Sequence, residues 1–176
     1  MIELMIVVAI IGVLAAVAIP SFVNYQLTSE RAEAYANLSA LAKAQKSYYA
    51  EFNQFIGVPA EPSSTEGPPT STKRLKTNID TAFRTVGWAP DGNVFFDYDT
   101  STPLATACTC VDGCFTATAY GDLDGDGTIS AMIYVHPDVS GNDCPSGLFG
   151  YLAPVDGSGA RDFDQVARVT LGADDF

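Results

Sequence analysis

Residues Leu4 to Ile19 read LMIVVAIIGVLAAVAI, sixteen consecutive positions without a polar side chain. At a rise of about 1.5 Å per residue, this stretch predicts roughly 24 Å of helix that is apolar on every side. Such a helix must lie in lipid or be surrounded by other helices. A chain that stays alone in water does not accommodate it.

Two familiar kinds of N-terminal segment share this apolar character. A cleaved signal peptide has a similar length, but no basic region precedes this one, and the helical pattern continues after Ala18. A plain membrane anchor leaves Glu3 unexplained, because an acid in a membrane-spanning sequence is costly and usually functional. Since no basic residue lies nearby in sequence, we expect Glu3 to pair with the amino terminus of a neighbouring copy.

The helical period continues beyond Pro20 through residues 21–54, which predict an amphipathic helix. Residues at spacings of three and four form one apolar stripe: Ala34, Leu38, Leu41, Gln45, Tyr48 and Phe52. Residues 1–52 therefore predict a single bent helix of roughly 78 Å, at about 1.5 Å per residue. Because this is far longer than a small domain, half of the helix must project, a shape suited to polymerisation.

The residues from Ile2 to Gly12 and from Leu14 to Pro20 closely resemble the N-terminal helix of type IV pilins. In that family a prepilin peptidase removes a leader before a methylated Phe, which is followed by Thr and Leu. Met1 falls where the family has this Leu. The resemblance therefore implies that the leader, the Phe and the Thr are missing from the start of the printed sequence.

The resemblance also assigns roles in assembly to three stem residues, Glu3, Gly12 and Pro20. Glu3 matches the family's assembly glutamate, which pairs with the N-terminal amine of an adjacent subunit; the alternative is a chance acid that reaches the membrane interface. Gly12 and Pro20 bracket a stretch that the family unwinds in the filament. Independently, Pro20 removes a helix hydrogen bond and Gly12 weakens the helix, so an ordinary kink stays an alternative.

Residues 55–92 predict the irregular connection that pilins place between helix and sheet. Val58 to Thr72 is rich in Pro, Ser, Thr and Gly, and we expect neither helix nor strand there. A short helix is predicted at Lys76 to Val86. The basic side chains of this region are expected to contact the acidic surface of a neighbouring subunit, with DNA as the less favoured alternative: Lys73, Arg74 and Lys76.

Residues 93–176 predict an antiparallel sheet and a disulfide-containing C-terminal region. Four segments have strand composition: Asn93–Asp99, Cys114–Tyr120, Ile129–His136 and Gln165–Leu171. A sheet of about four strands packed against one long helix is an α+β fold. It agrees with the globular head that the pilin resemblance implies.

The turn between two predicted strands matches the first eight positions of a calcium-binding loop, with carboxylates at Asp122, Asp124 and Asp126. The twelfth position is Ile133 instead of the usual Glu, and Asp112 and Asp143 are the candidates to complete a site. The alternative is a polar hairpin turn in which Asp and Gly supply the backbone angles. We favour the turn and leave calcium as a possible ligand; no cofactor is required.

The cysteines Cys108, Cys110, Cys114 and Cys144 form an even set, which in an exported domain indicates disulfides. Three pairings are possible. If the strands on either side of the Asp-rich turn pair, Cys108 and Cys144 lie at matching distances from it, so we favour Cys108–Cys144 with Cys110–Cys114. Pilins commonly carry a disulfide in this region. A metal site formed by the four thiols is the less favoured alternative.

The charge balance argues against nucleic acid as a specific partner. The chain has 9 Lys and Arg against 21 Asp and Glu, a net charge of −12, whereas binding to nucleic acid depends on cations that neutralise phosphates. A single histidine, His136, and the absence of a Gly-x-Ser-x-Gly motif around Ser130 or Ser140 give no support for catalysis. We expect a protein that is not an enzyme.

Together these features predict a structural subunit that polymerises through its N-terminal helix into a type IV pilus for adhesion, twitching motility or DNA uptake. The expected partners are further copies of the chain, the prepilin peptidase and the pilus assembly machinery. The subunit is expected in the bacterial inner membrane first and then in the extracellular pilus. A type II secretion pseudopilin and a membrane-anchored, calcium-dependent binding module are the alternatives.

Overall fold

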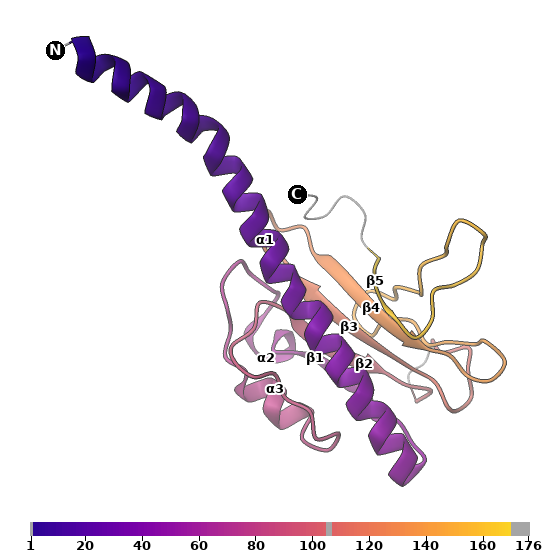
Figure 1. The fold of residues 1–176 in the computed structure, drawn as a ribbon. Coiled ribbons are helices and arrows are strands. Elements are labelled where there is room, and N and C mark those ends of the chain that lie inside the picture. The colour runs from indigo at the N-terminus through magenta and orange to yellow at the C-terminus, as the bar shows by residue number, and fades with distance from the viewer. Residues whose placement is uncertain (1, 105–106, 170–176) are drawn as a thin grey trace.

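A computed structural model of the chain describes residues 2–104 and 107–169 (Figure 1). One long helix crosses one face of an antiparallel sheet, and its N-terminal half projects away from the rest of the molecule. This confirms the predicted α+β fold. The elements in chain order are α1 Ile2–Phe52, β1 Val58–Glu61, α2 Ser63–Glu66, α3 Thr77–Ala82, β2 Asp97–Ser101, β3 Phe115–Gly121, β4 Ser130–His136 and β5 Val166–Arg168.

Helix α1 is continuous over 51 residues, including Gly12 and Pro20. Pro20 removes only its own N–H donor, and the Ala, Leu, Ile and Val residues around it are compatible with helix. The Ser21 hydroxyl donates to the Val17 carbonyl at 3.2 Å in the following turn. The helix therefore passes through both residues with a gentle curve and no break (Figure 1).

The sheet is a meander in which every strand pairs antiparallel with the next one along the chain, in the order β1-β2-β3-β4-β5. The longest ladder joins β3 to β4, with Ala119 opposite Met132. Short side chains dominate β3, which lets α1 approach the centre of the sheet. The last predicted strand, 165–171, contains β5 and extends outside the described residues.

The Pro-rich connection holds regular structure that the sequence analysis did not expect. Strand β1 and helix α2 both lie within residues 58–72, so the prediction of neither helix nor strand there was wrong. Strand β1 is at the edge of the sheet, where Pro59 is exposed and its missing N–H costs no ladder bond. Pro62 then precedes the single turn of α2.

The core lies between the second half of α1 and the sheet. Ala34, Leu38 and Leu41 are fully buried on α1, as the predicted stripe requires. The stripe then departs from expectation, because Phe52 is 53% exposed. Tyr49, four residues after Gln45, continues the row instead, and its ring stacks on Phe55 with centroids 4.4 Å apart.

Gln45 is the polar side chain at the centre of this interface and is wholly buried. Its amide nitrogen donates to the Ile56 carbonyl at 2.7 Å, and its Oε1 accepts from the Ile56 N–H at 3.1 Å. The Thr100 hydroxyl donates to the same carbonyl at 2.7 Å. Gln45 thus fixes the path of the chain from the end of α1 into β1 and β2.

Replacing Gln45 with Ala is expected to lower the free energy of unfolding by about 2–4 kcal/mol, because two backbone groups of Ile56 lose a partner inside the core. Denaturant unfolding of the detergent-solubilised chain, followed by near-UV circular dichroism, measures the effect. Gln54→Ala is the matched control, since Gln54 is exposed. Equal stability of the two variants would contradict the assignment.

Candidate functional site

The candidate site for assembly is the stem, defined as residues 2–23 of α1. Its large apolar side chains are 44–74% exposed, from Val23 to Ile2. The helix is long and apolar enough to cross a membrane, and no part of its most apolar window is buried against the head. The described part of the head leaves this surface uncovered, because α1 packs against the core only from Leu27 onward.

Glu3 lies in the first turn of α1 and is exposed. A carboxylate is favoured there, since unpaired N–H groups make the N-terminus of a helix partly positive. Six ion pairs between described residues lie in the head, from position 33 to position 164, and Glu3 is in none of them. Glu3 is therefore positioned for a contact outside its own head, and its pairing with a neighbouring amine stays a prediction.

Gly12 and Pro20 lie on the same projecting segment. No atom lies within 4 Å of the position that a Cβ would take at Gly12. Pro20 leaves the Ala16 carbonyl without its usual helical donor. The stem thus contains two weak points for helix geometry, and their unwinding in a filament stays a prediction.

The head is attached to α1 by a carboxylate, Glu33, that the sequence did not single out. Its Oε1 accepts the Phe95 N–H at 2.9 Å, and its Oε2 pairs with the Lys73 ammonium at 3.0 Å. Asn37, one turn further along, donates to the Tyr98 hydroxyl at 2.8 Å. These bonds join α1 to segments about 40 to 60 residues away in sequence.

The basic cluster of the connection is used inside the head. Arg74 is almost buried, pairs with the fully buried Asp97 and donates to the Gly67 carbonyl at 2.7 Å. Lys76 lies 3.7 Å from Asp80. The expectation that Arg74 faces a neighbouring subunit was therefore wrong. The side chains of Lys73 and Lys76 are 47% and 38% exposed, and their contact with a neighbour stays a prediction. A loop with few apolar side chains is instead attached to the sheet through charge.

A second polar cluster joins α1, β4 and the segment before β5. The Asp164 carboxylate contacts the Lys46 ammonium at 2.8 Å, the His136 ring at 2.7 Å and the Tyr134 hydroxyl at 3.0 Å. Partial burial by itself raises the pKa of Asp164, but hydrogen bonds from Lys46, His136 and Tyr134 bring it below its usual value. His136 therefore has a structural partner here.

Asp99 is a buried carboxylate on the face of the sheet away from α1. Its Oδ2 accepts from the Tyr120 hydroxyl at 2.9 Å and from the Gly147 N–H at 3.1 Å. A Cβ at position 147 would lie 2.8 Å from that oxygen, so the close approach requires glycine. Burial raises the pKa of Asp99 to about 6, although these hydrogen bonds oppose the shift. Asp99 thus holds the C-terminal loop against the sheet.

The Asp-rich turn brings Asp122, Asp124 and Asp126 together, with one oxygen from each within 4.8 Å of the others. The two Asp122 oxygens accept the N–H groups of Gly125 and Gly127 at 2.9 and 3.2 Å. Asp124 and Asp126 accept amide hydrogens from the same turn. The carboxylates therefore already act as caps of a hairpin between β3 and β4.

The further ligands that a calcium site needs are used elsewhere. Ile133, at the twelfth position, is buried in β4. Asp143 pairs with Arg161 at 2.8 Å, and Asp112 caps the Gly113 N–H at 2.6 Å. The donor set found at this turn fits a hairpin better than a closed cation cage.

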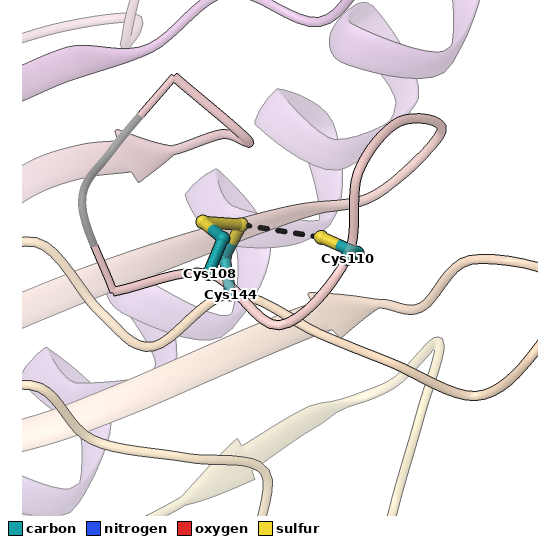
Figure 2. A group of neighbouring side chains, drawn as sticks. All are labelled: Cys108, Cys110 and Cys144. Atoms are coloured by element: carbon teal, nitrogen blue, oxygen red, sulfur yellow. Dashed lines mark hydrogen bonds between the residues drawn. A yellow bond between two sulfur atoms is a disulfide. The ribbon is translucent and has the colours of Figure 1, made fainter.

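The structure joins Cys108 to Cys144 and Cys110 to Cys114, the pairing that the sequence favours. The Cys108–Cys144 bond ties the loop before β3 to the segment after β4 (Figure 2). The two disulfides lie side by side, because the Cys144 sulfur is 3.5 Å from that of Cys110.

One half of α1 is apolar and exposed, and the other half packs in the core of the head. This arrangement defines a class of protein: a stem-and-head subunit whose stem requires lipid or other stems. Sequence comparison agrees. The chain is 56% identical over 55 residues to the type IV major pilin protein PilA of Myxococcus xanthus, a stretch that covers 31% of this chain and 25% of that one.

Two further relatives extend the similarity. The type IV major pilin protein PilE1 of Neisseria gonorrhoeae is 36% identical over 92 residues, 47% of this chain and 53% of that one. A fimbrial protein of Pseudomonas aeruginosa is 42% identical over 66 residues, 38% and 42% of the two chains. The chain thus spans about half the length, or less, of the relatives it matches.

No protein-family model matches the chain. Nevertheless, the chain has the long N-terminal helix and the antiparallel head of the type IV pilin fold, and its similarity in sequence is to type IV major pilins and a fimbrial protein.

The buried Asp99 predicts a contribution to the stability of the head that is lost as the pH rises. Its pKa is about 6 in the folded chain, against an ordinary value of 3.8. The folded state therefore binds this proton more tightly, and the stabilisation is complete below pH 3.8 and lost as the pH rises through 6. The expected loss is about 3 kcal/mol of unfolding free energy.

Denaturant unfolding of the wild type and of Asp99→Asn between pH 4 and pH 8 isolates this effect, because Asn keeps the shape and cannot ionise. The wild-type free energy of unfolding should fall relative to that of Asp99→Asn across this range. Asp91→Asn, which changes an exposed acid, should follow the wild type. Parallel curves for wild type and Asp99→Asn would show that the carboxylate is not buried as described.

Proposed function

We propose that the chain is a structural subunit that polymerises through its N-terminal helix into a type IV pilus. The observation that carries the proposal is the stem, an apolar surface that the head cannot cover and that begins with one acid, Glu3. The similarity to major pilins, strongest in the 56% identical stretch of 55 residues, supports it. Stems packed side by side are the arrangement that removes this surface from water and keeps a carboxylate paired.

In this proposal, assembly moves the stem from lipid to a position among the stems of other subunits. The subunit waits in the inner membrane with its stem in lipid and its acidic head outside the cytoplasm. Glu3 then sets the register of the incoming subunit by pairing with the N-terminal amine of a copy already in the filament, since a carboxylate inside a helical bundle persists only when paired.

The energetic difference between the two states of the stem is small. Burial from water stabilises each large apolar side chain by about 1.5–3 kcal/mol, but lipid is as apolar as a neighbouring stem. Packing therefore decides the balance, and an external machine can both add and remove subunits. We infer that the partners are further copies of this chain, the prepilin peptidase and the pilus assembly machinery, and that the mature location is the extracellular pilus.

The role is structural and not enzymatic in this proposal, and adhesion, twitching motility and DNA uptake are all compatible with one filament. A type II secretion pseudopilin has the same stem and is the second candidate. Filament length in negative-stain micrographs separates the two, since a pilus extends far beyond the cell surface. A membrane-anchored calcium-dependent module is less favoured, because the Asp-rich turn is capped by its own amides.

Glu3→Gln tests the assembly role, because it removes the charge and keeps the length of the side chain. We expect surface filaments to be lost, while the full-length subunit accumulates in the membrane with a folded head. Electron microscopy of cells, together with membrane fractionation, measures both. Glu30→Gln changes an acid on the same helix that accepts a hydrogen bond from the Gln26 side chain one turn away, and should leave the filaments intact.

Loss of filaments caused by missing assembly can be distinguished from loss caused by a folding defect. Near-UV circular dichroism of the solubilised Glu3→Gln subunit should match the wild type, because Glu3 is exposed and lies far from the described residues of the head. Normal filaments carried by Glu3→Gln would overturn the assignment of Glu3, and a membrane-displayed head without filaments in the wild type would favour the anchor alternative.

We also propose that the head requires no cofactor, and that the Asp-rich turn is stable without a cation. The thermal unfolding midpoint should then be unchanged within about 1 °C between excess calcium and excess EDTA. Asp122→Ala should lower the stability by about 1–2 kcal/mol in both solutions, since two turn amides lose their acceptor.

Asp91→Ala is the control for loss of an exposed carboxylate outside this turn. A calcium-dependent rise of the wild-type midpoint that Asp122→Ala abolishes would contradict the proposal and establish a cation site at the turn.

A further inference from the structure

The two disulfides of the head share a single cluster of four sulfur atoms. The Cys144 sulfur lies 3.5 Å from the Cys110 sulfur and 3.6 Å from the Cys114 sulfur, in addition to its bond with Cys108. Figure 2 shows Cys110 pointing toward the Cys108–Cys144 disulfide. Cys144 is therefore within contact distance of three possible partners.

Access to this cluster from solvent is unequal. Cys114 and Cys144 are fully buried, and Cys110 is 5% exposed. Cys108 is the partly exposed member of the group. Cys108 is therefore the residue of the cluster that a thiol dissolved in water approaches first, and thiol–disulfide exchange depends on which sulfur is accessible.

The backbone around the cluster is held together independently of the disulfides. The Thr109 N–H and hydroxyl both donate to the Asp143 carbonyl, at 3.0 and 2.9 Å, and the Asp143 N–H donates back to the Thr109 hydroxyl at 3.2 Å. The Thr116 hydroxyl donates to the Cys144 carbonyl at 2.5 Å. These bonds keep Cys144 beside Cys110 when the link to Cys108 is broken.

The geometry points to a thiol–disulfide exchange relay in which Cys108 is the site of attack by a low-molecular-weight thiol and Cys144 passes the exchange to the Cys110–Cys114 disulfide. The relay keeps the loop before β3 covalently tied to the segment after β4 after external attack. It adds a site of reversible modification to the head and is independent of filament assembly.

The chemistry balances in two steps. An external thiolate attacks the Cys108 sulfur, forms a mixed disulfide with Cys108, and releases Cys144 as a thiolate. The Cys144 thiolate then attacks the Cys110 sulfur, forms a Cys110–Cys144 bond and releases Cys114 as a thiolate; attack on Cys114 releases Cys110 instead. Each step forms one S–S bond and breaks one, so no further oxidant or reductant is consumed.

Brief treatment of the detergent-solubilised full chain with reduced glutathione tests the relay. Free thiols are then alkylated, and the disulfides are mapped by mass spectrometry of an unreduced digest. The expected first product carries glutathione on Cys108, a new bond from Cys144 to Cys110 or Cys114, and one alkylated thiol on the remaining member of that pair.

The double variant Cys110→Ser/Cys114→Ser is the matched control, because it keeps the site of attack and removes the acceptor. Alkylated Cys144 should increase about tenfold relative to the wild type, since the released thiolate has no intramolecular outlet. Cys108→Ser gives a second test that needs no glutathione: Cys144 should be found bonded to Cys110 or Cys114 in a substantial share of molecules.

The wild-type map decides the matter even where a variant fails to fold. Glutathione on Cys108 together with alkylated Cys144 and an intact Cys110–Cys114 bond would overturn the relay, because the exchange would have stopped at the first step. Initial modification of Cys110 or Cys114 would overturn it as well, since Cys108 would then not be the site of attack.

Discussion

The structure depends on one constraint: the head covers only the second half of α1, and the apolar first half needs other surroundings. Its second half supplies fully buried side chains such as Leu38 and Leu41 to the core, and its first half carries an apolar surface that none of the described residues of the head covers. Because both halves belong to one unbroken helix, the direction of the stem is fixed by the packing of the head. Whatever surrounds the stem therefore also orients the sheet and its loops.

The head, in turn, owes much of its definition to polar contacts over long sequence distances. Glu33, Gln45 and Asp164 each join α1 to a segment that is separated from it by a loop. Asp97 performs the same task for the Pro-rich connection through Arg74. A small domain with Ala- and Thr-rich strands has a limited apolar core, and buried polar groups cost free energy unless they are paired. These polar contacts thus determine where each loop lies, while the apolar contacts hold the helix and the sheet together.

This division explains what the sequence could predict. The stem, the helical period and the strands around the Asp-rich turn follow from local patterns, and all three are found. Strand β1 could not be predicted, because it exists only as the partner of β2 and contains a proline that a free strand edge tolerates. The partners of Arg74 and the burial of Asp99 likewise depend on segments that come together only in the fold. Because the partner of Arg74 is distant in sequence, Arg74 was wrongly predicted to contact another subunit.

The same polar contacts use many of the basic side chains, and the acidic charge that remains affects the proposed filament. At least five of the nine basic side chains, Lys46, Lys73, Arg74, Lys76 and Arg161, pair with carboxylates of the chain itself. The net charge of −12 is then carried mostly by carboxylates without such partners, so approaching heads repel one another over roughly a Debye length, about 8 Å at physiological salt. The stem contributes the opposite force, attraction at contact. In the proposed filament, subunits whose heads repel one another would associate only where their stems are already aligned, and a membrane imposes that alignment.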